Sequence, residues 1–401
     1  MRILMILQAD FPPDIRVEKE VRSLAHAGHE VHLICKNVTG RKDEEIYPDL
    51  LYIHRLRAAK SWLHRWDNLR MFPIPQNPVW KQRICEVIQN FGIEAIHVHD
   101  LPLAPLAVKL GRKFNLPVIF DMHENYPAAL KAWRKRGPEK LLKNAWVARW
   151  VEKKVVHQVD RIIVVIEEQK VRLVNMGVPP DRIRVVSNTV DIKHFHPTNG
   201  TQQIRKKLAA EYILIYVGGV DENRGLETLI EAFSIVAKKN FSTKLLILGD
   251  GRKRHELECK VRARGLVGRV IFTGWVNFHQ VPDYIAASDV CLVPHPSNEH
   301  SDTTVPHKIF QYMALGKPVI VSDAKPLARI IRETKAGVVF RSNDPRELAE
   351  VIFSLQDKRK RKALGEKGQH AVREKYNWKH TAETLLTLYS ELQQSDITCE
   401  S

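Results

Sequence analysis

The stretch that decides the fold is Asn298–Asp323, with the sequence NEHSDTTVPHKIFQYMALGKPVIVSD. Its polar first part predicts a turn. The pattern then predicts a helix that begins at Thr303–Thr304, with Pro306 in the first turn, where a missing N–H costs nothing. Gly316 ends this helix, and VIVS after it predicts a short buried strand. Helix followed by buried strand is typical of an α/β protein.

The same helix carries polar groups at one place. Lys308 and Gln311 lie three residues apart and therefore share one helix face. The unpaired amides of the first turn stand at the positive end of the helix dipole, which favours bound phosphate. The stretch therefore predicts a site for a nucleotide diphosphate.

Length and composition set the broad class. A chain of 401 residues with 44% hydrophobic residues is long enough for two domains with full cores. No apolar run approaches the ~18 residues that span a bilayer. Met1 leads directly into the strand pattern RILMIL without the cleavage site of a signal peptide, so we expect a cytoplasmic protein. Five cysteines without C-x-x-C spacing predict neither a disulfide framework nor a zinc site.

The net charge is the strongest compositional signal. There are 63 Lys and Arg against 46 Asp and Glu, so the formal charge is +17. Such an excess favours an anionic partner: nucleic acid, an anionic bilayer surface or a phosphorylated substrate. No recognised nucleic-acid motif occurs and the basic segments are dispersed, so we expect no nucleic-acid partner.

Two segments combine basic residues with tryptophan. Residues 131–157 hold nine Lys or Arg and two acids, and residues 55–72 interleave basic and aromatic side chains. For 131–157 we expect contact with an anionic membrane surface, with a core helix that has a solvated face as the alternative. For 55–72 a lipid or nucleic-acid interface and a partly buried loop both stay open.

The first half of the chain opens as strand, helix and strand, over residues 2–7, the segment before Gly28, and residues 30–36. This is a Rossmann-like start without G-x-G-x-x-G. Asp14 and Arg16 lie in its first loop, either at the mouth of a cleft or as the capped, solvated start of a helix.

Histidines and acids follow two later strands. His97 and His99 alternate onto one side of a strand, but no third ligand lies in register, so we expect no metal there. Asp121, His123 and Glu124 emerge at the end of the strand VIFD, at the edge where doubly wound sheets bind ligands. His123 is either a ligand-binding residue or a satisfied core histidine.

The second half repeats the scheme. A strand leads into a loop with Gly218 and Gly219, and later segments read G-D-G and F-T-G-W, the last with Gly274 and Trp275. Trp275 either lines a base or fills the core.

The order of these segments resembles the family 4 retaining glycosyltransferases of the GT-B fold, over nearly the whole chain. The donor segment PHKIFQYMALGKPVIVSD is similar to the branch reading P-x-K-x-F-E-Y-M-A. Thr303 and Gln311 stand where the family has two glutamates, Gly219 where it usually has Arg, and Arg224 where it has Lys. These departures leave open a degenerate, non-catalytic partner.

The resemblance implies two Rossmann-like domains facing across a cleft. Residues 1–187 would form the acceptor-side domain, 188–206 a hinge, and 207–375 the nucleotide-sugar domain. Residues 376–401 would form a helix that crosses back to the first domain.

It also implies metal-independent transfer of a sugar, with retention, from a nucleotide sugar to a lipid-linked or cell-envelope acceptor on the inner face of the membrane. No D-x-D motif is present to hold a metal on the diphosphate, and no cofactor is expected. A GT-B relative acting without acceptor, such as an epimerase or phosphorylase, and a basic nucleic-acid-binding protein are the alternatives. The implied residues are catalytic His123, Arg224 and Lys308; donor-binding Gly218, Gly219, Gly274, Asp302, Thr303, Thr304 and Gln311; and acceptor-side Asp14, Arg16 and Glu124.

Overall fold

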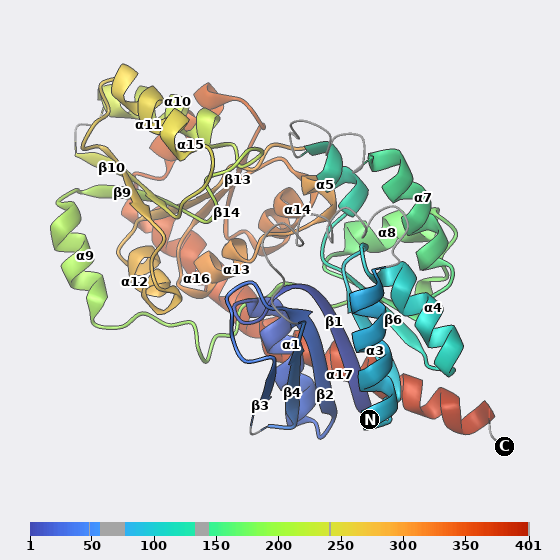
Figure 1. Ribbon diagram of the computed structural model, residues 1–401. Coiled ribbons are helices and arrows are strands. Elements are labelled where there is room, and N and C mark those ends of the chain that lie inside the picture. Colours follow the sequence, from blue (N-terminus) through green and yellow to red (C-terminus); the bar gives the residue numbers. More distant parts are fainter. Residues whose placement is uncertain (48, 57–76, 133–143, 240–241, 400–401) are drawn as a thin grey trace. The chain divides into compact units, whose positions relative to one another are not determined.

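The computed structural model describes residues 1–47, 49–56, 77–132, 144–239 and 242–399. Most of the basic and aromatic segment 55–72 lies outside these residues. The chain forms two compact units (Figure 1). The N-terminal unit combines Met1–Ser187 with Thr381–Ser401, and the C-terminal unit is Asn188–His380.

The N-terminal unit is built on one sheet with the strand order β3-β4-β2-β1-β5-β6-β7-β8. All neighbouring strands are parallel except β3 and β4. The strands are β1 (Arg2–Asp10), β2 (Glu30–Lys36), β3 (Glu44–Tyr47), β4 (Leu51–Arg55), β5 (Ala95–His99), β6 (Val118–Met122), β7 (Arg161–Val164) and β8 (Ile183–Val185). The strands predicted at residues 2–7 and 30–36 are confirmed, and β1 runs three residues further.

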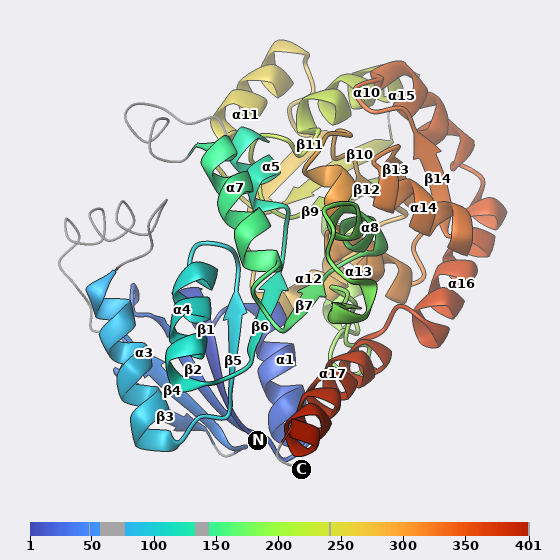
Figure 2. The same cartoon turned by 90° about the vertical axis from the view of Figure 1, so that its right-hand side faces the viewer.

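Helices cover both faces of this sheet, as its buried strands require. They are α1 (Ile15–His26), α3 (Pro78–Phe91), α4 (Ala104–Phe114), α5 (Tyr126–Ala132), α7 (Ala145–Val156), α8 (Glu167–Asn175) and α17 (Trp378–Cys399), with a short 3-10 turn η1 (Pro180–Arg182). Side chains of α3, α4 and α7 share one apolar core with alternate residues of β1, β5 and β6. Helices α1 and α17 lie on the opposite face (Figure 2).

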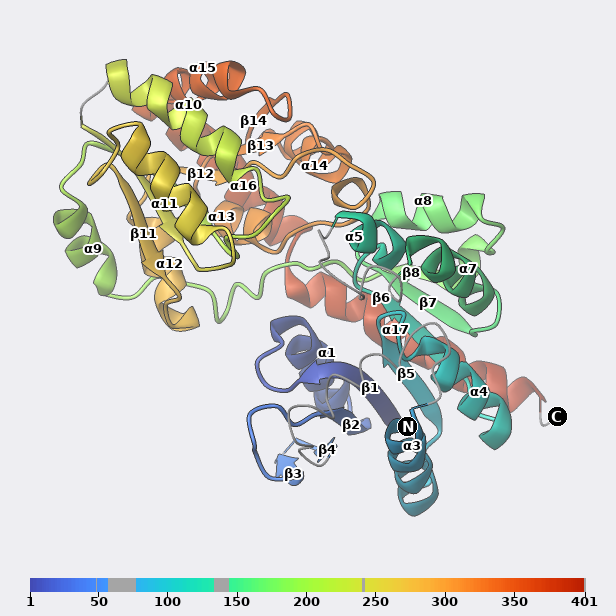
Figure 3. The same ribbon diagram turned by 45° about the horizontal axis from the view of Figure 1, so that its top comes forward.

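Helix α17 belongs to this unit although it comes last in the sequence. It crosses behind β5 and β6 (Figure 3). The hydroxyl of Tyr389 lies 2.7 Å from Nδ1 of His97 on β5. Arg184 of β8 donates to both carboxylate oxygens of Glu391, at 2.8 and 2.7 Å. A bidentate pair of this kind fixes orientation as well as position.

The C-terminal unit has a parallel sheet with the order β11-β10-β9-β12-β13-β14. Its strands are β9 (Tyr212–Val217), β10 (Thr243–Leu248), β11 (Val270–Gly274), β12 (Val290–Val293), β13 (Val319–Ser322) and β14 (Gly337–Phe340). Its helices are α9 (Gly200–Leu208), α10 (Leu226–Lys239), α11 (Arg254–Ala263), α12 (Val281–Ala286), α13 (Lys308–Ala314), α14 (Lys325–Thr334), α15 (Pro345–Ser354) and α16 (Lys358–Glu374), with 3-10 turns η2 (Phe278–Gln280) and η3 (Ser301–Thr303). The apolar side chains of α10, α11 and α15 pack on one face of the sheet.

Two expectations about this unit are wrong. Helix α13 begins at Lys308 rather than at Thr303, because residues 301–303 form η3 and Thr304 is extended. At seven residues it is too short for its dipole to carry a phosphate site alone. Residues 200–206, expected in the hinge, form most of α9, whose Thr201 hydroxyl donates to Asp283 at 2.8 Å.

Among the residues that the structure describes, no helix is both long and apolar enough to cross a bilayer.

Candidate functional site

The order of strands in the C-terminal unit reverses between β9 and β12, which are neighbours in the sheet. In an open α/β sheet, ligands bind beyond the carboxyl ends of the strands at such a switch point. Here β9 ends at Val217 and leads into the loop 218–225, while β12 ends at Val293 and leads into Pro294 and His295. The residues of these two loops are therefore the candidate ligand-binding site of the C-terminal unit.

The loop 218–225 packs so closely on its neighbours that several positions accept only glycine. A Cβ at Gly249 would lie 2.2 Å from the carbonyl oxygen of Gly218, and one at Gly251 would lie 2.4 Å from that of Val220. A Cβ at Gly225 would lie 1.8 Å from the carbonyl oxygen of Pro294. Close backbone contacts at these glycines thus hold the loop against the ends of both β10 and β12.

Two cations meet at this switch point. Nζ of Lys308, the first residue of α13, lies 4.0 Å from the ring centroid of Tyr216. It also lies 2.6 Å from where a Cβ of Gly218 would stand. Arg224 is close enough to influence the pKa of Lys308, Tyr216 and His295. Within the described ranges, neither Lys308 nor Arg224 has a carboxylate at ion-pair distance.

The electrostatics of this group favour an anion. Burial, and then the charge of Arg224, hold the pKa of Lys308 well below its ordinary value. Burial also holds the pKa of His295 well below its usual range, and both cations lower it further. Nε2 of His295 is buried and has no hydrogen-bond partner in the described part of the chain. A bound anion would relieve the repulsion between Lys308 and Arg224 and could accept from Nε2 of His295.

The other donor residues expected from the sequence lie in the same unit with different surroundings. Gln311 is half-buried on α13, one turn after Lys308. Asp302 accepts from the Ser297 hydroxyl at 3.0 Å and from the Lys325 N–H at 3.1 Å, so its carboxylate braces the loop. Thr303 donates its hydroxyl to the carbonyl of Glu299 at 2.7 Å.

Gly219, Thr304 and Gly274 are the remaining predicted donor-binding residues. Gly219 accepts the Tyr216 hydroxyl at 2.9 Å, and Thr304 is half-buried and extended. Gly274 ends β11 with φ +73° and is followed by Trp275. Trp275 is 71% exposed, so the alternative that it fills the core is wrong.

The N-terminal unit has its own switch point, between β1 and β5. Asp14 follows β1 and caps α1, accepting from the N–H groups of Arg16 and Val17 at 3.1 and 3.2 Å. Arg16 contacts Nδ1 of His123, which brings the first loop to the end of β6. Glu124 follows His123 and is half-buried. The structure thus places the predicted acceptor-side residues around the predicted histidine.

His123 is held by carboxylates on both ring nitrogens. Nε2 lies 2.5 Å from Oδ2 of Asp121, and Nδ1 lies 3.2 Å from Oδ2 of Asp100. Burial and the charge of Arg16 act to lower the pKa of His123, but Asp100 and Asp121 outweigh them and raise it to about 10. The two carboxylates therefore favour the charged imidazole, in which both ring nitrogens donate hydrogen bonds.

The premise that no third ligand lies in register with His97 and His99 is wrong. Glu20 of α1 and Asp121 of β6 share their buried cluster, and Asp121 is the register partner of His99. Glu20 comes from a helix 77 residues earlier in the chain, which no local pattern announces. His295 was missed for another reason: it follows a buried strand just as His123 does, and the same rule applied to VCLVPH would have found it.

Comparison with known proteins finds a glycosyltransferase family model for each half of the chain. The glycosyl transferase 4-like domain matches residues 13–189, and the glycosyl transferases group 1 family matches residues 200–371. The chain belongs to these glycosyltransferases.

Individual relatives are distant in sequence. The alpha-D-kanosaminyltransferase of Streptomyces kanamyceticus is 22% identical over 254 residues, which cover 61% of this chain and 64% of that protein. Sucrose-phosphate synthase from Thermosynechococcus elongatus is 21% identical with a TM-score of 0.81, covering 98% of this chain and 100% of that one. Anabaena HepE in complex with UDP-glucose is 14% identical with a TM-score of 0.71, covering 98% and 100%. The expected fold class, with two Rossmann-like parallel-sheet domains of the GT-B type, is confirmed.

Proposed function

We propose that this protein transfers a sugar from a nucleotide-sugar donor to an acceptor, with retention of anomeric configuration and without a metal on the diphosphate. The observation that carries the proposal is the pairing of Lys308 and Arg224 beside buried His295, with no carboxylate neutralising either cation in the described ranges. A leaving nucleoside diphosphate carries roughly two to three negative charges, and fixed charges that stabilise it are usually the largest catalytic term. The solved structure of HepE with UDP-glucose supports a nucleotide sugar as the ligand of this fold.

The other residues are assigned around that diphosphate. Gln311, one turn along α13, accepts a ribose hydroxyl through its carbonyl, a weaker bond than a carboxylate would make. Trp275, which is exposed, and the adjacent buried Gly274 are assigned to the base. Asp302, Thr303 and Thr304 shape the loop near the donor sugar, since the first two are already engaged within that loop.

The acceptor side is assigned to the N-terminal unit. Charged His123 donates an N–H to a sugar hydroxyl when Nδ1 exchanges Asp100 for that hydroxyl. Asp100 is the more accessible of its two carboxylate partners, with 34% side-chain exposure against 1% for Asp121. Asp14, Arg16 and Glu124 surround this position.

Ligand-induced stabilisation tests the donor assignment. A panel of UDP-, GDP-, ADP- and dTDP-sugars is added in the presence of EDTA, and unfolding is followed by calorimetry. A donor at about 100 times its Kd stabilises the folded state by about 2.7 kcal/mol, so one base class should raise the Tm of the C-terminal unit. Conversion or hydrolysis without any acceptor would favour an epimerase or phosphorylase instead. Strongly salt-dependent DNA binding without donor binding would contradict the proposal.

The acceptor is proposed to be lipid-linked, at an anionic membrane surface, because of the outer face of α7. Ala148, Val151 and Val155 are buried in the core, while Trp146 and Trp150 are 77% and 58% exposed. The spacing of three and four residues puts these tryptophans on one face, which they share with Arg149, Lys153 and Lys154. Nζ of Lys154 lies 3.6 Å from the Trp150 ring centroid. Tryptophans among cations suit the headgroup region of an anionic bilayer.

Vesicle co-sedimentation tests this face. Binding is expected to anionic vesicles and to be weak on zwitterionic ones, since each cation near an anionic surface contributes about 1 kcal/mol. The double change Trp146→Ser and Trp150→Ser should reduce partitioning about tenfold or more. Trp275→Ser, which removes a comparably exposed tryptophan from the C-terminal unit, is the matched control. Equal losses in both variants would show that α7 is not the contact surface.

A further inference from the structure

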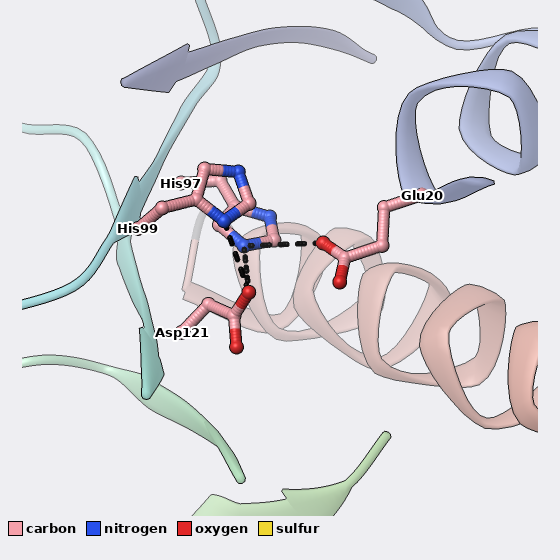
Figure 4. Close-up of side chains that lie close together, drawn as sticks. All are labelled: Glu20, His97, His99 and Asp121. Carbon is pink, nitrogen blue, oxygen red and sulfur yellow. Dashed lines mark hydrogen bonds and ion pairs between the residues drawn. The ribbon is translucent and has the colours of Figure 1, made fainter. Parts of the chain in front are cut away.

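A buried cluster of four ligand-type side chains lies between the sheet of the N-terminal unit and helix α1 (Figure 4). His97 and His99 point to one face of β5, and Asp121 is the register partner of His99 on β6. Glu20 reaches the same place from α1, which covers that face. One ligand atom from each residue lies within 4.8 Å of the other three.

The separations fit a small coordination sphere. Nε2 of His97 lies 3.9 Å from Oε2 of Glu20 and 3.8 Å from Oδ2 of Asp121. Nδ1 of His99 lies 3.0 Å from Oδ2 of Asp121. Ligand atoms that bind one tetrahedral ion at ordinary bond lengths are roughly 3.3 Å apart. Small side-chain rotations would bring these groups to that spacing.

Each of the four residues also has a buried polar atom without a hydrogen-bond partner among the described residues. These atoms are Oε2 of Glu20, Nε2 of His97, Nε2 of His99 and Oδ1 of Asp121. Side chains this deeply buried normally satisfy such atoms. A cation bound by Oε2 of Glu20 and Nε2 of His97 would satisfy two of these atoms at once, and two carboxylates match the charge of a divalent ion.

The surroundings orient the ligands as metal sites usually require. Nδ1 of His97 lies 2.7 Å from the Tyr389 hydroxyl, which leaves Nε2 facing the cluster. Oδ2 of Asp121 lies 2.5 Å from Nε2 of His123, so this carboxylate is held from outside the cluster as well. Outer partners of this kind fix the ring orientation of a ligating histidine.

We propose that Glu20, His97, His99 and Asp121 bind one divalent transition-metal ion of the Zn²⁺ class inside the N-terminal unit. Two imidazoles with two carboxylates suit Zn²⁺ and its neighbours better than Mg²⁺ or Ca²⁺, which prefer oxygen ligands alone. Four protein ligands in a site closed to solvent are typical of a structural ion. The ion has no open position for a diphosphate, so it is separate from the proposed donor site.

The ion would join three parts of the unit. It links α1 to β5 and β6 directly. Through Tyr389 it reaches α17, and through Asp121 it reaches His123. The role of the ion is therefore to fix Asp121, and through it the orientation of the His123 ring.

Metal analysis of the full chain, purified without a polyhistidine tag, tests the proposal. We expect about one metal ion per chain by mass spectrometry. Removal with dipicolinate should lower the Tm of the N-terminal unit by about 5 °C or more, and added Zn²⁺ should restore it. Refolding with Co²⁺ should give the visible absorption of a tetrahedral nitrogen and oxygen site.

Substitutions of the four residues test whether they bind the measured metal ion. His97→Gln and Glu20→Gln should each reduce metal content at least about tenfold. His32→Gln is the matched control: His32 is a fully buried histidine of β2 with a carboxylate partner, Glu30 at 2.8 Å, and should keep the metal. If His97→Gln does not fold, Glu20→Gln, which preserves side-chain shape, decides. A chain that stays metal-free after refolding in Zn²⁺, Co²⁺ and Mn²⁺, or a Glu20→Gln variant with unchanged metal content, would overturn the proposal.

Discussion

The change Lys308→Met is expected to lower kcat about a hundredfold or more, the usual effect of removing one fixed charge that stabilises a leaving group. Methionine keeps an unbranched apolar chain over the Tyr216 ring, so the loss reports the missing charge rather than a cavity. The family has an arginine where this chain has Gly219, and Lys308 is proposed to replace its charge. Steady-state kinetics with the donor found in the ligand panel, together with calorimetric donor binding, measure the effect.

Two comparisons make this result decisive. Lys367→Met removes an exposed lysine of α16 in the same unit and should leave kcat unchanged. Arg224→Met should cause a loss of similar size, since both cations act on one diphosphate. If Lys308→Met were nearly as active as the natural chain while Arg224→Met were inactive, the replacement role of Lys308 would be wrong.

The change Gly225→Ala is expected to destabilise the C-terminal unit by about 3 kcal/mol or more. Gly225 has φ +68°, and an added Cβ would lie 1.8 Å from the backbone carbonyl oxygen of Pro294. The loop would have to move away from the end of β12, taking Arg224 away from His295. We therefore expect a Tm lower by roughly 10 °C and weaker donor binding, both measurable by calorimetry.

Gly265→Ala separates the steric clash with Pro294 from the cost of placing alanine in a left-handed backbone conformation. Gly265 has nearly the same backbone conformation, φ +66°, but nothing lies within 4 Å of its added Cβ. Its expected cost is only the left-handed conformation, about 1 kcal/mol. Equal destabilisation by both substitutions would mean that the contact with Pro294 is unimportant.

The sequence predicted most strands because their signal is local. Runs such as residues 30–36 and 319–322 are apolar, bounded by polar or glycine residues, and became β2 and β13 with little change. The start of α13 was predicted five residues too early, because side-chain bonds compete there with helix. The amide oxygen of Asn298 accepts from the N–H groups of His300 and Ser301, and Thr303 bonds back to Glu299, which closes a tight turn instead.

The candidate sites were predictable to the extent that topology alone determines them. Placing His99, Asp121 and His123 at the ends of neighbouring strands needed only the rule for parallel sheets, and the register of β5 with β6 agrees. The partnership of Glu20 with His97 depends on how α1 lies over the sheet, a tertiary property that spacing does not encode. The repulsion between Lys308 and Arg224 likewise arises only when the start of α13 meets the loop 218–225.

The chain passes between its two units twice, after Ser187 and before Thr381, and the two passages lie side by side where Val190 pairs with Asn377. The C-terminal unit is thus one continuous stretch, whereas the N-terminal unit is assembled from the two ends of the chain. A fragment cut at the first passage would lose Tyr389 and Glu391, and with them the partners of His97 and Arg184. For separate expression, residues 381–399 would have to be spliced onto the first fragment, whereas the second unit can be cut out directly as residues 188–380.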